Sequence, residues 1–181
     1  MADDRKRPIP WAAPVRIDDV PEGGRHVELT TDEPTRAALA AYAELRTLPQ
    51  ASATFDVRRR GRDGLHVTGE VRATVGQTCV VSLEPMETEI VEPVDVVFKP
   101  AASPQPATEG AAEETGEADA PEPLVDGTAD LGALATEFLI LGIDPYPRKP
   151  DAVFEPPAAK GDDAGPFAAL AKLKGSSESK K

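Results

Sequence analysis

The chain has 181 residues, of which 40% are hydrophobic and only 4% aromatic, and it carries a formal net charge of −12 at pH 7. This length predicts one domain with tails, and the acidic balance argues against a general nucleic-acid binder, which usually carries a basic face. A single cysteine excludes a disulfide within the chain, and a polar N-terminus and the lack of a long apolar run predict a cytoplasmic protein without a signal peptide or a membrane span.

The first predicted elements are two short strands and a helix. Residues 1–13 are charged and then proline-rich, which predicts a flexible terminus. A strand is predicted over 14–20, and a second one over 25–30, where apolar and polar residues alternate. A helix is predicted over 32–46, because threonine and acidic residues precede the early Pro34 and an apolar stripe follows at helical spacing.

A long β-hairpin and a further strand give the strongest strand signal. Apolar residues alternate over 53–58 and 65–75, and the sequence Gly61-Arg62-Asp63-Gly64 between them is typical of a hairpin turn. A last strand is predicted over 87–99, where Pro93 indicates an edge. Because these strands follow one another as hairpins, we expect an α+β fold, with a curved or barrel-like antiparallel sheet and two packed helices.

The second half of the chain combines an acidic segment with two apolar ones. Residues from about 101 to 128 contain carboxylates but no lysine or arginine, which predicts a disordered acidic loop. Asp130 is predicted to cap a helix over 131–141. A short helix over 166–174 is as well suited to docking on a partner as to packing on the core. The expected organisation is a flexible N-terminus over 1–13, a single α+β domain over 14–155 interrupted by the acidic loop, and a flexible tail over 156–181 that contains the short helix.

Cys79 is the first candidate for a reactive group. A catalytic thiol needs a neighbouring base, and the only two histidines, His26 and His66, lie within predicted strands. We therefore favour a packing role for Cys79, and a thiol enzyme is the less favoured alternative. One cysteine and two scattered histidines also do not supply a metal site. No catalytic residue, metal or cofactor is expected.

Five arginines fall on the predicted hairpin, and three of them alternate so as to share the face opposite the core. They could form a cationic strip that contacts phosphates. The interleaved acids Asp56, Asp63 and Glu70 favour an ordinary charged sheet face, to which we give more weight. A further hypothesis is that the acidic loop competes with RNA for the strip, so that deletion of residues 101–125 raises RNA affinity. The candidate contact residues for RNA or for a protein partner are Arg58, Arg59, Arg60, Arg62 and Arg72.

Two motifs in combination resemble a known family. The first is Gln77-Thr78-Cys79-Val80-Val81-Ser82-Leu83-Glu84-Pro85, and the second is Asp130-Leu131-Gly132-Ala133-Leu134-Ala135-Thr136-Glu137-Phe138-Leu139. With these motifs the chain resembles the large ribosomal RNA subunit accumulation protein family, YceD, over about residues 14–175. The proline-rich segment 144–150 is similar to the alphaproteobacterial branch of that family. The positions that carry the family motifs are Cys79, Ser82, Leu83, Pro85, Asp130, Leu131 and Glu137.

The resemblance implies a role in the accumulation of 23S ribosomal RNA, and the family offers no catalytic residues to carry over. Ser82 stands where relatives often have a second cysteine, which removes the basis for a metal or redox role. We expect a non-enzymatic factor that promotes 23S rRNA synthesis, processing or accumulation. Its expected partner is the 23S rRNA precursor or a large-subunit ribosomal protein, and neither DNA nor a membrane. The alternative is a small acidic protein-interaction module unrelated to ribosomes.

Overall fold

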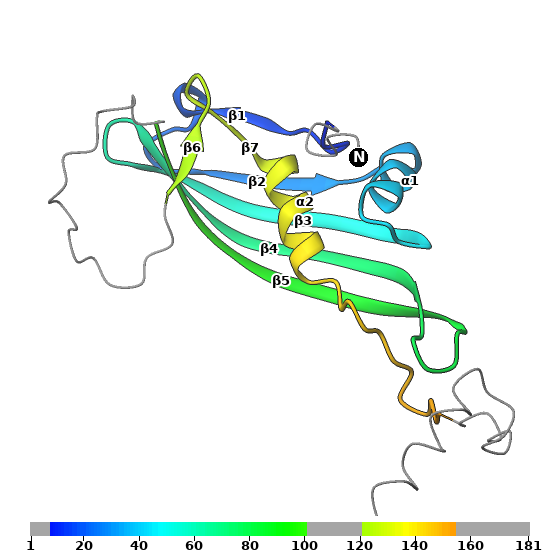
Figure 1. The fold of residues 1–181 in the computed structure, drawn as a ribbon. Helices are drawn as coiled ribbons and strands as arrows, with labels where there is room; N and C mark the ends of the chain where they lie inside the picture. Colours follow the sequence, from blue (N-terminus) through cyan, green and yellow to red (C-terminus); the bar gives the residue numbers. More distant parts are fainter. Residues whose placement is uncertain (1–7, 101–120, 155–181) are drawn as a thin grey trace, which may run out of the picture.

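The structure is a computed structural model that describes residues 8–100 and 121–154 (Figure 1). Its main sheet has the strand order β2-β3-β4-β5-β6, antiparallel throughout except for the parallel pair β5–β6. The bounds of these strands are β2 Arg25–Thr30, β3 Thr47–Arg60, β4 Gly64–Thr78, β5 Pro85–Pro100 and β6 Glu122–Leu124. A second, two-stranded sheet pairs β1 (Pro14–Arg16) with β7 (Thr128–Asp130).

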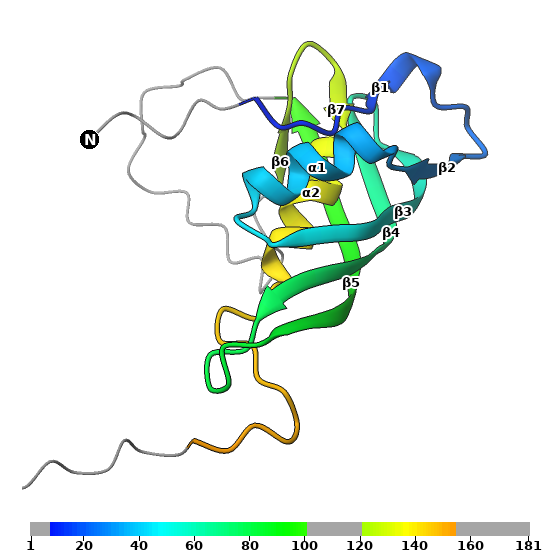
Figure 2. The same cartoon turned by 90° about the vertical axis from the view of Figure 1, so that its right-hand side faces the viewer.

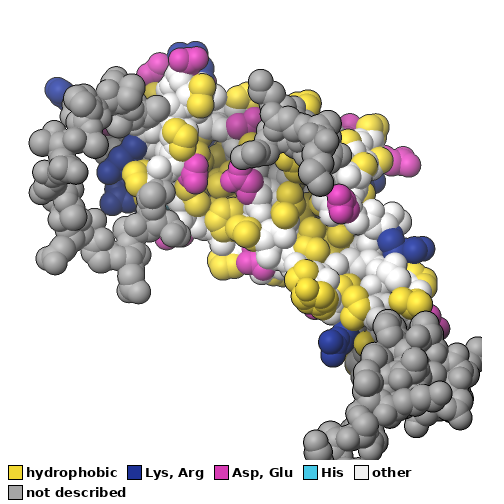
Figure 3. Space-filling view, in the orientation of Figure 1, with side chains coloured by type: hydrophobic (Ala, Val, Ile, Leu, Met, Phe, Trp, Pro, Cys, Tyr) yellow, Lys and Arg dark blue, Asp and Glu magenta, His cyan; other side chains and the backbone are white. Residues whose placement is uncertain are grey.

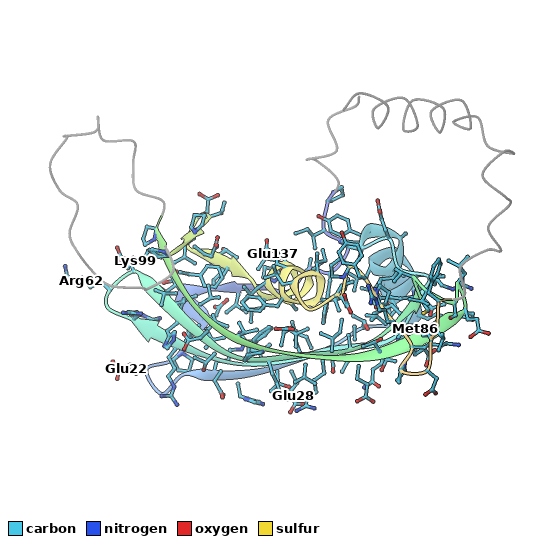
Figure 4. All side chains as sticks on the ribbon, turned by 60° about the horizontal axis from the view of Figure 1, so that its bottom comes forward. Glu22, Glu28, Arg62, Met86, Lys99 and Glu137 are labelled. Carbon is cyan, nitrogen blue, oxygen red and sulfur yellow. The ribbon has the colours of Figure 1, made fainter. Side chains whose placement is uncertain are left out.

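Two helices, α1 (Glu33–Tyr42) and α2 (Leu131–Leu141), lie on the same, concave face of the main sheet (Figure 2). The expected α+β fold with a curved antiparallel sheet and two packed helices is confirmed. The sheet does not close into a barrel, because β2 and β6 each have a neighbour on one side only. One face of the sheet therefore carries the core, and among residues 8–100 and 121–154 no helix covers the convex face (Figure 4).

Strict alternation along β3 and β4 builds the core. Phe55, Val57, Val67 and Val71 are fully buried on the concave side, while the residues between them are exposed or half-buried. Because only one face of the sheet is buried, apolar and polar residues alternate along these strands, and this alternation can be recognised in the sequence. Leu131 is also fully buried, so that α2 completes the core from above the sheet.

The start of α2 is fixed by Asp130, as the sequence predicts. Its Oδ1 accepts hydrogen bonds from the backbone N–H groups of Gly132 and Ala133, at 3.0 and 3.1 Å, and from that of Ala13 at 2.8 Å. One carboxylate thus caps the helix and holds the N-terminal segment. Trp11, which lies within the predicted flexible terminus, packs there with only 6% of its surface exposed.

The helix predicted over 32–46 is shorter in the structure. α1 ends at Tyr42, Glu44 has a left-handed backbone with φ of 56°, and β3 already starts at Thr47. Leu48, which continues the apolar spacing of the predicted helix, is instead buried as a strand residue. The sequence prediction was wrong here because an apolar residue at this spacing suits either the helix or the strand that follows.

Part of the predicted acidic loop is ordered. Residues 121–130 form β6, a tight turn and β7, because Leu124 and Ala129 are buried in the core. The strand predicted over 14–20 is also shorter, since β1 covers Pro14–Arg16 and a 3-10 turn follows at Ile17–Asp19. The rest of the predicted loop, residues 101–120, and the helix predicted over 166–174 lie outside the described residues.

Candidate functional site

Three of the five candidate arginines gather at one end of the sheet, where the β3–β4 hairpin turns. Arg58 and Arg60 alternate on β3 and share its convex face, and Arg62 lies in the turn. Register adds a residue that the sequence analysis missed: Leu65 pairs with Phe98, which brings Lys99 to this end of the sheet. Figure 4 shows Arg62 and Lys99 at the same end. We call Arg58, Arg60, Arg62 and Lys99 the arginine corner.

The other two candidate arginines are used elsewhere. Arg59 points away from the convex face, and its Nε donates a hydrogen bond of 2.6 Å to the carbonyl oxygen of Val20. Arg72 pairs with Ser52, six positions along β3 from Arg58, which is about 20 Å at the usual rise of a strand. Arg72 also forms an ion pair with Glu70. The five arginines therefore do not form one continuous strip.

The acids near the arginine corner are mostly engaged by histidines. His26 Nδ1 lies 2.9 Å from Asp56 Oδ1, and His66 Nε2 lies 2.7 Å from Asp95 Oδ1. The hydrogen bond that the imidazole donates to the Asp56 carboxylate raises the pKa of His26 above its usual value of 6.5. Within the described part of the chain, no ion pair involves the four cations of the arginine corner. All four residues are exposed (Figure 3 shows basic side chains at this end).

The first family motif forms the turn between β4 and β5, at the opposite end of the sheet, where Figure 4 labels Met86. Cys79 N donates to the Glu84 carbonyl and Leu83 N donates to the Cys79 carbonyl, both at 2.9 Å. Leu83 has a left-handed backbone, with φ of 59°. The motif residues therefore have a structural role, because they close a tight turn around the Cys79 side chain.

Cys79 is buried within this turn, and its sulfur is surrounded by hydrogen-bond donors. The N–H groups of Ser82 and Lys149 each lie 3.4 Å from the sulfur. Hydrogen bonding by Ser82, through its side chain and then its backbone, together with the Lys149 N–H, lowers the pKa of the thiol to about 6. Neither histidine reaches the sulfur, because both are bonded to carboxylates on the convex face.

The second motif is spread along α2. Asp130 caps the helix and Leu131 lies in the core, whereas Glu137 is exposed on the helix surface. The pKa of Glu137 is raised, mainly because its carboxylate is partly buried and also because the charge of Glu122 is nearby. Among residues 8–100 and 121–154, no three histidine, cysteine or acidic side chains are grouped so as to hold a metal ion. No helix in these ranges is long and apolar enough to cross a membrane.

Comparison with known protein families shows what this chain is similar to. Residues 67–174, which make up more than half of the chain, match the family described as large ribosomal RNA subunit accumulation protein YceD. The matched region contains both motifs, but it starts after Arg58, Arg60 and Arg62. Searches of curated proteins and of solved structures gave no significant match.

Proposed function

This chain belongs to the large ribosomal RNA subunit accumulation protein family YceD, and on that premise we propose that it is an accessory factor in large ribosomal subunit biogenesis. It promotes the synthesis, processing or accumulation of 23S rRNA in the cytoplasm. The observation that carries this proposal is the family match over residues 67–174, which includes the turn around Cys79 and the whole of α2.

We also infer that the factor does not catalyse a reaction. The rival, a thiol enzyme, requires a base beside Cys79 and access for a substrate. The described groups that donate to the sulfur are Ser82 and the backbone N–H groups of Val81 and Lys149. They stabilise a thiolate but do not act as a base for its proton, and the side chain is fully buried. These contacts support a structural role for Cys79.

For the contact with RNA, the arginine corner is the surface that we propose. Arg58, Arg60, Arg62 and Lys99 are exposed on one end of the sheet, and cations in this arrangement release counterions when they meet phosphates. Such contacts are independent of sequence and position the protein on the RNA backbone. The net charge of −12 favours a second candidate partner, a basic ribosomal protein of the large subunit.

The first experiment is a sucrose-gradient ribosome profile, with 23S and 16S rRNA quantified, in a strain depleted of this protein. We expect fewer free large subunits and a lower ratio of 23S to 16S rRNA. Re-expression of the chain from a plasmid should restore both. A normal profile and ratio after depletion would contradict the biogenesis role and leave the acidic interaction module as the better account.

The second experiment asks whether the arginine corner touches RNA. The triple variant Arg58→Glu, Arg60→Glu and Arg62→Glu should lose ultraviolet crosslinks to 23S precursor. The matched control is Arg72→Glu, which reverses an arginine on the same face that is already paired with Glu70. Equal crosslinking by the triple variant and the control would exclude the corner as the RNA contact.

A further inference from the structure

A groove of about 440 Å³ opens between the first turns of α2 and the strands β5, β6 and β7. Most of its lining is apolar, with Phe98 and Leu134 buried at its base and Pro123 and Val125 at its rim. Val125 is 68% exposed, so the rim is uncovered among the described residues. The space is large enough to admit a long side chain with an apolar stem.

Two carboxylates from separate elements line this apolar groove. Glu122 lies on β6 and Glu137 lies on α2. Figure 4 shows Glu137 on the helix side of the sheet. Asp130 also lines the groove, but its Oδ1 caps α2. Figure 3 shows acidic side chains among hydrophobic ones on this face. The groove therefore combines an apolar base with negative charge.

No described cation neutralises these carboxylates. The ion pairs within residues 8–100 and 121–154 involve neither Glu122 nor Glu137. Lys99 is the next residue after Phe98 on β5, but alternation along the strand places the two side chains on opposite faces. The charge of Glu122 also disfavours ionisation of Glu137, and a cation placed between them would relieve this repulsion.

We propose that this groove binds a lysine or arginine side chain presented by a basic protein segment. The alkyl stem lies against Phe98 and Leu134, and the cationic head lies between Glu122 and Glu137. A purely apolar side chain would cover the two carboxylates without pairing them, which is costly. Phosphate groups would be repelled by the same charges. The inference goes beyond the proposed function, because it names a protein partner by its chemistry and holds whether or not the arginine corner contacts RNA.

The test uses the full chain, labelled with ¹⁵N, and two synthetic peptides. The probe is acetyl-Gly-Leu-Arg-Leu-Gly-amide, and the control peptide replaces arginine by citrulline, which has nearly the same shape but no charge. We expect the arginine peptide to shift the amide signals of Phe98, Ala133 and Glu137. Loss of the charge-assisted hydrogen bonds should weaken binding of the citrulline peptide about tenfold.

Variants then assign the binding to the groove. Glu122→Gln and Glu137→Gln keep the side-chain shape and should each weaken binding of the arginine peptide roughly threefold or more, with a larger loss in the double variant. The control is Glu89→Gln, an exposed acid on β5 outside the groove, which should bind like the unmodified chain. Thermal melting of each variant verifies that it is folded.

Two results would overturn the proposal. One is undiminished binding of the arginine peptide by the folded double variant. The other is a set of shifted signals that excludes Phe98, Ala133 and Glu137. A failure of this test leaves the rRNA ratio in the depleted strain unaffected, so the two proposals are judged separately.

Discussion

The Cys79 sulfur accepts a hydrogen bond of 3.4 Å from the backbone N–H of Lys149, although 70 positions separate the two residues. Two further contacts support it: Val80 N donates to the Pro147 carbonyl at 2.9 Å, and Lys149 Nζ lies 2.7 Å from Glu84 Oε2. The segment after α2 is therefore fastened to the turn between β4 and β5. Both partners of this contact lie within the region that matches the family.

The first prediction concerns the ionisation of Cys79. Its pKa is lowered to about 6 from 9.0, so the folded protein should hold a thiolate at pH 7, and its ultraviolet absorbance should titrate with a midpoint near pH 6. Because the folded pKa is the lower one, the thiolate's contribution to stability is complete above the unfolded pKa and is lost as the pH falls through about 6. Thermal melts of the unmodified chain and of Cys79→Ala between pH 5 and 9 measure this contribution.

A matched control for that experiment is Cys79→Ser, which retains a hydrogen-bond acceptor but does not ionise in this range. As in Cys79→Ala, the melting temperature of Cys79→Ser should lack the pH dependence that ionisation of the thiol causes in the unmodified chain. A thiol midpoint near the ordinary value would show that the donors around the sulfur do not stabilise the thiolate.

The second prediction concerns Gly69 in the middle of β4. A Cβ at this position would lie 1.9 Å from the carbonyl oxygen of Thr54, so that the paired strands would have to separate. Gly69→Ala should lower the free energy of unfolding by about 1–3 kcal/mol or more, measured by urea denaturation. Gly23→Ala is the control, because its Cβ meets nothing within 4 Å and the change should stay within about 0.5 kcal/mol. Equal stabilities would contradict the close approach.

The third prediction concerns the ion pair of His26 with Asp56. Asp56 raises the pKa of His26 above 6.5, which NMR titration of the imidazole should show, and Asp56→Asn should reduce the shift. Because the folded pKa is the higher one, the pair's contribution to stability is complete below about pH 6.5 and is lost as the pH rises through the raised value. An unchanged His26 titration in Asp56→Asn would refute the assignment of the shift to this contact.

The fourth prediction separates Arg59 from its neighbours. Its guanidinium donates to the carbonyl oxygens of Val20 and Asp18, at 2.6 and 3.4 Å, and so holds the turn after β1 against β3. Arg59→Ala should lower the free energy of unfolding by about 1 kcal/mol and leave RNA crosslinking unchanged. Arg58→Ala is the complementary variant, with little effect on stability. A loss of crosslinks in Arg59→Ala without a loss of stability would show that Arg59 contacts RNA together with the arginine corner.

The candidate sites were only partly predictable because a strand pattern does not determine which residues end up beside one another. Arg58, Arg60 and Arg62 could be grouped from the sequence, since they share one hairpin. Lys99 could be added only from the register of β5 against β4, and Glu122 could be placed near Glu137 only once β6 was known to lie beside β5. A prediction of the register of β4 against β5, made from the turn that joins them, would have placed Lys99 at this end of the sheet.

The elements that could be predicted from the amino-acid sequence are those whose burial is one-sided and whose ends carry local signals. Alternation specified β3 and β4, and Asp130 with the apolar spacing after it specified α2, because these patterns repeat within a few residues. The end of α1, the two short strands within residues 121–130 and the contact of Cys79 with Lys149 became known only from the folded structure. Each of these depends on contacts between residues far apart in the chain, which stabilise conformations that local propensity leaves open.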